Sequence, residues 1–286
     1  MTGEGSQDLT LTVDDRPVVV YARSVMPSLD PETPWLKRSG FLYDLMTPSG
    51  IVLTESMPAD HPHQHGVMIA WTSGLLDGQK IDCWNSHKLE GLVEHREVVR
   101  AEKNLLEVEL NHISLLDDEP ETIIRESWGV EVQSVDGVNV VDLESRQWLK
   151  TSKEFRIRQY KYGHFCFRGR DDWLFGRCTL TTDEGVDRVK GNHMVPKYAL
   201  MHGLLSRRET EAALMVGVAV ISHPENSPHE HPVRLHPQDP YFSFAPMVAG
   251  EFSLKRDEPF VTRYRIITFD GPPPIESIES LRNEFV

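Results

Sequence analysis

The chain has 286 residues, a formal net charge of −14 and a hydrophobic content of 39%. The negative charge argues against binding to nucleic-acid phosphates and to anionic membrane surfaces, because both need basic patches. The longest apolar run, residues 212–221, is far shorter than the roughly 20 residues of a membrane-spanning helix. Three cysteines without CxxC spacing, and no signal-peptide pattern, predict a protein of the reducing cytoplasm.

From the N-terminus onward, the chain reads as strands separated by turns. Residues 1–8 are small and polar and are expected to be loosely ordered. Alternating side chains and bounding turn residues predict strands at 9–13, 18–21, 41–43, 51–53, 92–101, 105–114, 123–135, 138–150, 154–160, 164–168, 212–222, 251–254 and 261–270. Asp136-Gly137 lies between two of these runs and predicts a tight hairpin.

A helix is expected only at the C-terminal end of the sequence. There, three prolines precede apolar residues at helical spacing, namely Ile275, Ile278, Leu281 and Phe285. No dinucleotide-binding or P-loop pattern occurs, and no alternation of strands and helices predicts a parallel sheet. We therefore expect an all-β protein, a large antiparallel β-sandwich forming one domain over residues 1–286. Its site should lie on a concave sheet face or at the loops on the rim, and homodimerisation is left open.

The segment 60–66 holds three histidines at alternate positions. If it is extended, as Pro62 favours, His61, His63 and His65 fall on one face. Imidazoles exchange protons near neutral pH and bind metal ions, and Asp60 could orient one of them. We predict His61 and His63 to be catalytic, with a divalent metal on His61, His63 and His65 as the alternative. The structural alternative is a turn whose histidines bind loop carbonyls.

A second histidine run follows the apolar stretch 212–221. It begins at His223 and continues through Glu225 to His229 and His231. Because His223 stands where a buried strand emerges, we predict that it forms the opposite wall of the site. Glu225 is a candidate base. The alternative is a proline-shaped surface loop with solvated imidazoles.

A compact polar triplet, His95-Arg96-Glu97, lies inside the predicted strand 92–101. Alternation would place His95 and Glu97 on one face and Arg96 on the other. Glu97 is the other candidate base, although a solvated face with cross-strand ion pairs explains the triplet equally well. Trp71 and Trp84 are expected to lie in the core.

The motif Asp60-His61-Pro62-His63, followed by Gly66 and an apolar strand ending at Trp71, resembles the signature of PmoA-like proteins. Weaker matches follow in the same order at residues 47–50, 95–97, 161–163, 168, 223–226, 232–234, 264–265 and 270–271. The likeness spans residues 15–272. Family members usually carry histidine where this chain has Gln64 and Val233.

The resemblance implies a supersandwich similar to that of sugar mutarotases and a carbohydrate-related role. It extends the predicted substrate-binding set, which is Asp60, His95, Arg96, Lys161, Arg168, Asn226, His231 and Arg234. The first hypothesis is an epimerase, lyase or hydrolase that uses histidine and glutamate acid–base chemistry on a polyhydroxylated metabolite. The second is a metal-dependent oxygenase or hydrolase, and the third is a non-catalytic sugar-binding sandwich.

Overall fold

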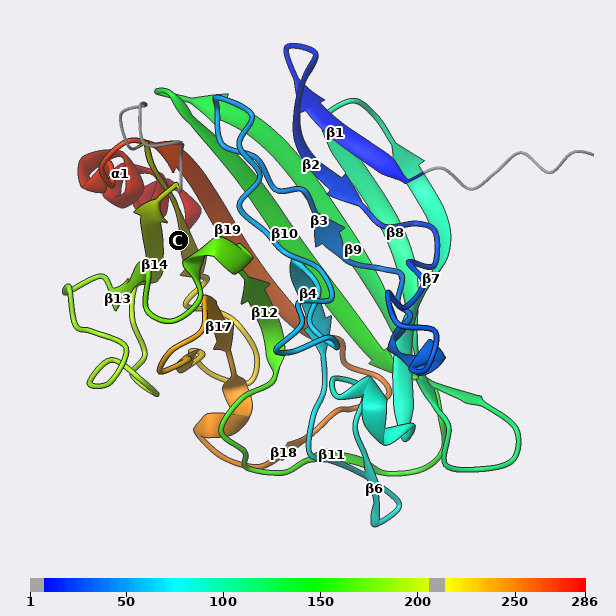
Figure 1. The fold of residues 1–286 in the computed structure, drawn as a ribbon. Helices are drawn as coiled ribbons and strands as arrows, with labels where there is room; N and C mark the ends of the chain where they lie inside the picture. The colour runs from blue at the N-terminus through cyan, green and yellow to red at the C-terminus, as the bar shows by residue number, and fades with distance from the viewer. Residues whose placement is uncertain (1–7, 206–213) are drawn as a thin grey trace, which may run out of the picture.

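Two large antiparallel sheets form the two layers of this protein, as the predicted β-sandwich requires (Figure 1). The computed structural model describes residues 8–205 and 214–286. Residues 1–7 of the N-terminal stretch that was expected to be loosely ordered lie outside this part. The two layers share one hydrophobic core, to which strands of both sheets contribute.

The first layer is a seven-stranded sheet that carries the segment around the first histidine cluster. Its strands, in spatial order, are β1 (Leu9–Val13), β2 (Arg16–Tyr21), β3 (Leu42–Tyr43), β4 (Val67–Ala70), β12 (His164–Arg168), β17 (Tyr241–Phe244) and β16 (Val233–Leu235). The central pair, β4 and β12, joins segments about a hundred residues apart, with His164 opposite Ala70 and Phe167 opposite Val67.

The second layer is an eight-stranded sheet with the longest strands. In spatial order they are β13 (Cys178–Thr182), β14 (Tyr198–Leu204), β15 (Met215–Ser222), β19 (Phe260–Asp270), β10 (Val138–Leu149), β9 (Glu121–Val135), β8 (Leu105–Ser114) and β7 (Gly91–Ala101). In β8 alternate residues are buried, which is the pattern that a sheet with one wet face produces. The predicted hairpin joins β9 to β10, and Asp136 and Gly137 both have positive φ, at 49° and 80°.

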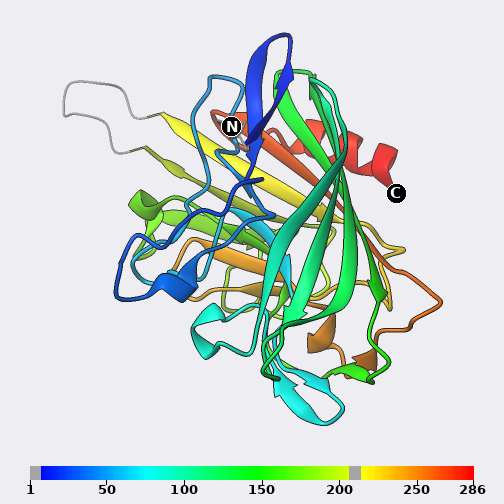
Figure 2. The same cartoon turned by 90° about the vertical axis from the view of Figure 1, so that its right-hand side faces the viewer.

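A small sheet and one helix complete the fold at opposite ends of the molecule (Figures 1 and 2). The small sheet contains β18 (Phe252–Ser253), β11 (Phe155–Ile157), β5 (Gly74–Leu76) and β6 (Gln79–Ile81). Helix α1 (Ile275–Phe285) was expected from its apolar spacing, and it buries Ile278 and Leu281 against the eight-stranded sheet. Short 3-10 turns cover Pro34–Leu36, Ser86–Lys88, Asp171–Trp173 and Pro246–Val248. No helix in the described ranges has the length and apolarity to cross a membrane.

Several strand predictions need correction. Residues 51–53 form only an isolated bridge through Val52, and the strand predicted at 154–160 is limited to β11. The strand predicted at 212–222 is described only from residue 214, with β15 beginning at Met215. The sequence patterns also missed short strands, β13, β14, β16 and β17 among them. Nearly every residue of β14 and β17 is buried, so these two strands show little alternation. β13 and β16 do alternate in burial and were still missed.

Polar side chains lie on the face of the seven-stranded sheet that points away from the eight-stranded sheet. The ring of Phe165 contacts Tyr264 of β19 at 4.2 Å, so Phe165 points inward. Side chains alternate along a strand, which places Cys166 and Arg168 on the outward face. Tyr241 lies opposite Arg168 in β17 and shares that face. Both Arg168 and Tyr241 are nevertheless buried, because loops cover this side of the sheet.

Candidate functional site

The loop that carries the first histidine cluster is compact and not extended. The N–H of His61 donates to the carbonyl of Pro58 at 3.1 Å, and the N–H of Gln64 donates to that of His61 at 2.8 Å. These turns replace the alternation expected for the three histidines, which was wrong. The rings of His61 and His63 still lie together, with their centroids 5.7 Å apart.

His65 leaves the cluster and enters the core. It is buried, and its ring packs against Phe41 at 4.7 Å. Burial lowers the pKa of His65 well below its usual value, so the ring is neutral. The chain turns sharply at Gly66, where a Cβ atom would lie 2.1 Å from the carbonyl oxygen of Leu42. His65 is therefore not a partner for a metal on His61 and His63.

A buried arginine fixes the start of this loop. Arg168 donates from Nη1 to Oδ2 of Asp60 at 2.7 Å and from Nη2 to Oδ1 at 2.8 Å. It also donates to Asp171 at 3.1 Å and to the amide oxygen of Gln64 at 3.3 Å. Gln64 thus supports Arg168 and does not point at the histidines. Gln64 therefore contacts the pair formed by Arg168 and Asp60, and not the imidazoles of His61 and His63.

Asp60 connects Arg168 to His61 through its carboxylate. Burial would raise the pKa of Asp60, but the hydrogen bonds from Arg168 and His61 outweigh it and hold that pKa at about 2. The carboxylate lies 2.7 Å from Nδ1 of His61. A carboxylate that accepts from one ring nitrogen sets the tautomer and the orientation of the ring.

The partner of His61 across the site comes from the turn between β16 and β17. His236 lies with its ring centroid 5.7 Å from that of His61, and Asp239 places Oδ2 3.7 Å from Nδ1 of His61. The same oxygen lies 3.1 Å from Nδ1 of His236. Sequence reasoning missed this pair, although a histidine and an aspartate three residues apart beside a proline are a recognisable turn signal.

His63 has a histidine neighbour of its own. His87 lies in the 3-10 turn Ser86–Lys88, with its ring 5.4 Å from that of His63. Burial lowers the pKa of His63 to about 4, and the neighbouring charges of His61 and His87 contribute. His63 is therefore neutral at pH 7 and can accept a proton. We call His61, His63, His87 and His236 the outer histidine group.

Asp82 builds the turn that presents His87. Its buried carboxylate accepts the backbone N–H groups of Trp84 and Asn85, at 3.0 and 2.8 Å, and Nζ of Lys88 at 2.6 Å. Burial would raise the pKa of Asp82, but these hydrogen bonds lower it overall. The ring of Trp84 lies 5.7 Å from that of Tyr162 and 6.4 Å from that of Tyr241. Trp84 is buried, as expected for a core residue.

One of the predicted cationic residues lies beside this group. Arg234 of β16 is opposite Ser243, so it shares the outward face with Tyr241. Its charge is among those that oppose protonation of His236, whose pKa is lowered to about 4 mainly by burial. The outer histidine group is thus bordered by Asp60 and Arg234. Lys161, also predicted to bind substrate, makes its contact with His193, whose Nε2 lies 3.1 Å from the Lys161 carbonyl.

Residues 8–283 match a family of unknown function, DUF6807. The chain belongs to DUF6807. The match spans both large sheets and every residue of the outer histidine group, so the whole site lies within the family range. No curated protein matches the chain.

The second histidine run of this DUF6807 protein lies elsewhere. The ring of His223 packs against Phe285 of α1 at 5.2 Å, and Nδ1 of His223 accepts the N–H of Glu225 at 3.1 Å. A hollow of about 100 Å³ beside His223 is lined by α1 and the residues before β14. In the described parts of the chain, no contact joins His223 to His61 or His63. The structure does not make His223 and Glu225 the opposite wall that the sequence predicted.

Two more residues of that run are structural. Asn226 donates to Ser222 Oγ and the carbonyl of Arg263, both at 3.0 Å, and accepts the N–H of Arg263 at 2.7 Å. His231 is buried, with Nδ1 2.7 Å from the hydroxyl of Tyr264 and Nε2 2.8 Å from the carbonyl of Ser227. Both residues hold loops in place and are not brought to the outer histidine group.

The triplet in β7 also lies apart from the site. The pairing of β7 with β8 shifts between His95 and Glu97, so the expected alternation is broken by a bulge. His95 turns inward, with Nδ1 2.9 Å from the hydroxyl of Tyr21. Arg96 stays on the surface, where it pairs with Glu97 and Glu109. Glu97 is therefore not positioned as a base for His61 or His63.

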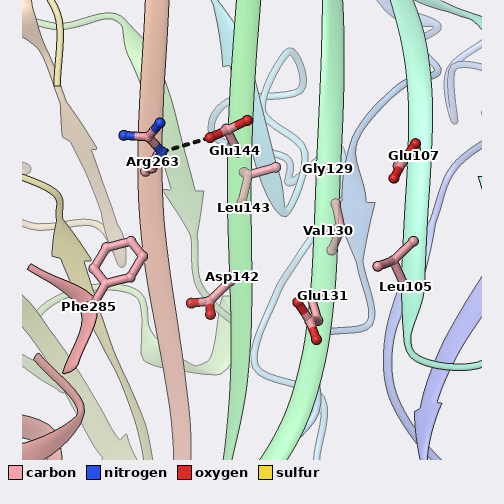
Figure 3. A pocket seen from close by; sticks show the side chains of 10 residues that line it. All are labelled: Leu105, Glu107, Gly129, Val130, Glu131, Asp142, Leu143, Glu144, Arg263 and Phe285. Carbon is pink, nitrogen blue, oxygen red and sulfur yellow. Dashed lines mark hydrogen bonds and ion pairs between the residues drawn. The ribbon is translucent and has the colours of Figure 1, made fainter.

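A hollow on the outer face of the eight-stranded sheet differs in character (Figure 3). It has a volume of about 220 Å³ and forms where Gly129 leaves a gap between Glu107 and Glu144. Arg263 donates to Glu144 at 2.7 Å across one side of it. No histidine lines this hollow, and its charged groups are largely paired, so it offers less chemistry than the outer histidine group.

Proposed function

We propose that this DUF6807 protein is an enzyme that carries out acid–base chemistry on a sugar or a related polyhydroxylated metabolite. The outer histidine group is its active site. The observation that carries the proposal is the convergence of four histidines from three separate segments, whose rings form a chain of contacts from His87 through His63 and His61 to His236.

The support of His61 favours catalysis over packing. Burial of an arginine is unfavourable unless its N–H donors are satisfied. Arg168 donates three hydrogen bonds to the carboxylates of Asp60 and Asp171. The side chain of His61 remains 31% exposed. A buried cation that orients a carboxylate toward a solvent-accessible imidazole is an arrangement that fixes a catalytic histidine, so it supports a catalytic role for His61.

The environments of His61 and His63 assign their roles. Burial keeps His63 neutral, and its ring contacts are with His61 and His87, so it is the base that accepts a proton from substrate. His61, held by Asp60, donates a proton to the substrate oxygen. Two groups in different electrostatic surroundings can work as a base and an acid at the same pH. Arg234 positions hydroxyl or carboxylate groups of the substrate.

The choice of a sugar rests on the resemblance to PmoA-like proteins and on the mutarotase-like sandwich expected from it. Fold does not determine function, so this part of the proposal rests on analogy. Epimerisation, elimination and hydrolysis all need one proton removed and one delivered, which the pair His63 and His61 can do. We place the reaction in the cytoplasm, in keeping with three buried cysteines that are all free thiols.

Proton NMR in D₂O tests the proposal without a known product. Aldoses, uronic acids and methyl glycosides are incubated with the protein, and anomer exchange, loss of C–H signals, vinyl signals and methanol release are followed. We expect one class of sugar to react, and His63→Gln to slow the reaction about 100-fold or more. The control is His223→Gln, which lies outside the site and should react within twofold of the wild-type rate.

The outcomes separate cleanly. Full activity in His63→Gln, with an unchanged melting temperature, would contradict the assignment of the base. No reaction with any of the sugars, together with saturable binding that survives His63→Gln, would favour the non-catalytic sugar-binding alternative.

A further inference from the structure

Three side chains of the outer site are arranged as metal ligands. His61, His236 and Asp239 each offer one ligand atom, and these atoms all lie within 4.8 Å of one another. Across residues 8–205 and 214–286, no other group of three histidine, cysteine or acidic side chains meets this condition. The set differs from the ligands expected from the sequence, because His63 and His65 are not members.

The spacing matches that of atoms around one ion. Ligands about 2.1 Å from a metal ion lie about 3.0 to 3.4 Å from one another in octahedral or tetrahedral geometry. Oδ2 of Asp239 is 3.1 Å from Nδ1 of His236 and 3.7 Å from Nδ1 of His61. Oδ2 of Asp60 is 2.7 Å from Nδ1 of His61 and provides a fourth atom nearby. Small side-chain rotations would bring these atoms to equal distances from one centre.

Hydrogen bonds alone do not pair every lone pair of the ring nitrogens of His61 and His236 and of the carboxylates that face them. Nδ1 of His61 faces two carboxylates, Asp60 and Asp239, and a ring nitrogen carries one hydrogen at most. Nδ1 of His236 receives the backbone N–H of Asp239 at 2.9 Å, while the carboxylate of the same residue lies 3.1 Å away. Two acceptors at that distance repel each other unless a proton or a cation lies between them. A divalent cation would pair with all of these lone pairs at once.

The site is also open and supported. The side chains of His61, His236 and Asp239 are 31%, 21% and 14% exposed, so an ion can enter and keep positions free for water or substrate. Arg168 holds the adjacent carboxylate of Asp60 from below. Catalytic metal sites commonly combine three protein ligands with an open position and a layer of supporting hydrogen bonds.

We propose that His61, His236 and Asp239 bind a divalent transition-metal ion, with Asp60 as the adjoining carboxylate. Two imidazoles and a carboxylate suit zinc(II) and its first-row neighbours better than magnesium or calcium, which prefer oxygen ligands. Binding of the ion stands independently of the proposed function. When bound, the ion would replace the proton on Nδ1 of His61 and would hold the substrate oxygen in place of proton donation by His61. This use of the ion rests on the proposed function.

Titration calorimetry with zinc(II) tests the proposal on the full chain, purified without a histidine tag and freed of metal with a chelator. We expect one ion per chain. His236→Ala and Asp239→Ala should each weaken binding about 100-fold or more, since even supporting residues contribute about 10- to 100-fold. His223→Ala, a matched change at a histidine outside the site, should bind within threefold of wild type. Cobalt(II) absorption provides a second readout that reports the ligand geometry directly.

Binding of fewer than about 0.1 ions per chain, or equal affinity in wild type, His236→Ala and Asp239→Ala, would overturn the proposal. Thermal melts of both variants show that a loss of binding is not a loss of folding. The NMR assay on chelator-treated protein separates the two proposals. Activity without metal, alongside wild-type zinc binding, retains the site and removes its catalytic use. Binding without any sugar reaction leaves the metal site standing and counts against the proposed function.

Discussion

The protein contains two groups of histidines that are similar in size but differ in their surroundings. The inner histidine group (His112, His164 and His231) lies inside the sandwich and is buried. Its partners fill the interior: the ring of Trp71 stacks on His164 at 4.5 Å, and Tyr264 bonds to His231. The outer histidine group is partly exposed and meets the carboxylates of Asp60 and Asp239. Partners and solvent access, rather than the density of histidines, therefore distinguish a site from a packed interior.

One buried hydrogen-bonded pair in the inner group shows its structural role. His112 lies 2.7 Å from Glu126, which also accepts from Ser145 and Gln147. Burial would raise the pKa of Glu126, but these hydrogen bonds lower it. All of these groups are buried and lie on β8, β9 and β10, so they join neighbouring strands of the eight-stranded sheet away from solvent.

The largest effect should come from breaking the support of the outer group. Arg168→Met leaves Asp60 and Asp171 without their cation, and removing one partner of a buried pair costs about 3 kcal/mol or more. Urea denaturation measures this loss. Arg170→Met is the matched control two residues away. Arg170 is 27% exposed where Arg168 is fully buried, and it pairs with Asp172 and donates to the carbonyl of Val52, so a smaller loss of about 1 to 2 kcal/mol is expected. Equal losses in the two variants would show that Arg168 is not a special support.

The next effect is a pH dependence of the free energy of unfolding, caused by the inner histidine group. Burial lowers the pKa of His231 to about 3 and that of His164 well below its usual value. The unfolded chain binds these protons more readily, so stability is complete above about pH 6.5 and falls as the pH drops below it. The expected loss for His231 alone is about 2 kcal/mol at pH 5.

Denaturation curves at pH 8, 6.5 and 5 measure this dependence. His231→Gln should be less stable at pH 8 but lose less on acidification than wild type does. A variant whose stability falls just as steeply would exclude His231 as a source of the acid sensitivity.

A smaller effect should come from Asp60→Asn, which keeps the shape of the side chain and removes its charge. We expect zinc affinity and sugar turnover to fall about tenfold, in the range found for residues that orient a ligand. Calorimetry and the NMR assay measure the two quantities. Unchanged zinc binding would mean that Asp60 does not adjoin the ion.

The smallest effect is expected at the histidine that sequence reasoning placed opposite His61. His223→Gln changes a partly exposed ring against Phe285, so the free energy of unfolding should shift by about 0.5 kcal/mol or less. Zinc affinity should also stay unchanged. A clear loss of zinc binding in this variant would move His223 into the outer site and undo the contrast between the two regions.

Local patterns predicted most of the fold because they record which face of a strand is buried. The strands β8 and β12 begin and end as expected, and the Asp136-Gly137 hairpin and α1 form where they were predicted. Strands buried on both faces, such as β17, carry no alternation and were missed. The membership in DUF6807 names no activity, so it does not extend these predictions to function.

The site was predictable only in part, because its members are distant in sequence. His61, His63, Asp60 and Arg168 were recognised from composition and resemblance, but the contact of His61 with His236 depends on the turn between β16 and β17. The error at His223 has a simple cause, since histidine and proline runs also build loops that pack against their own sheet. Charge and spacing can suggest which residue types form a site, and only the sheet order shows which of them meet.

Asp60 and Arg168 are 108 positions apart in the sequence, which has a consequence for how the protein folds. Their contact forms only after β4 and β12 have paired, and pairing of such distant segments is slow. Zinc affinity would therefore arise late during refolding, after most strands have joined. In a stopped-flow experiment with a zinc-sensitive dye, the rate of zinc uptake would therefore report the rate at which the seven-stranded sheet is completed.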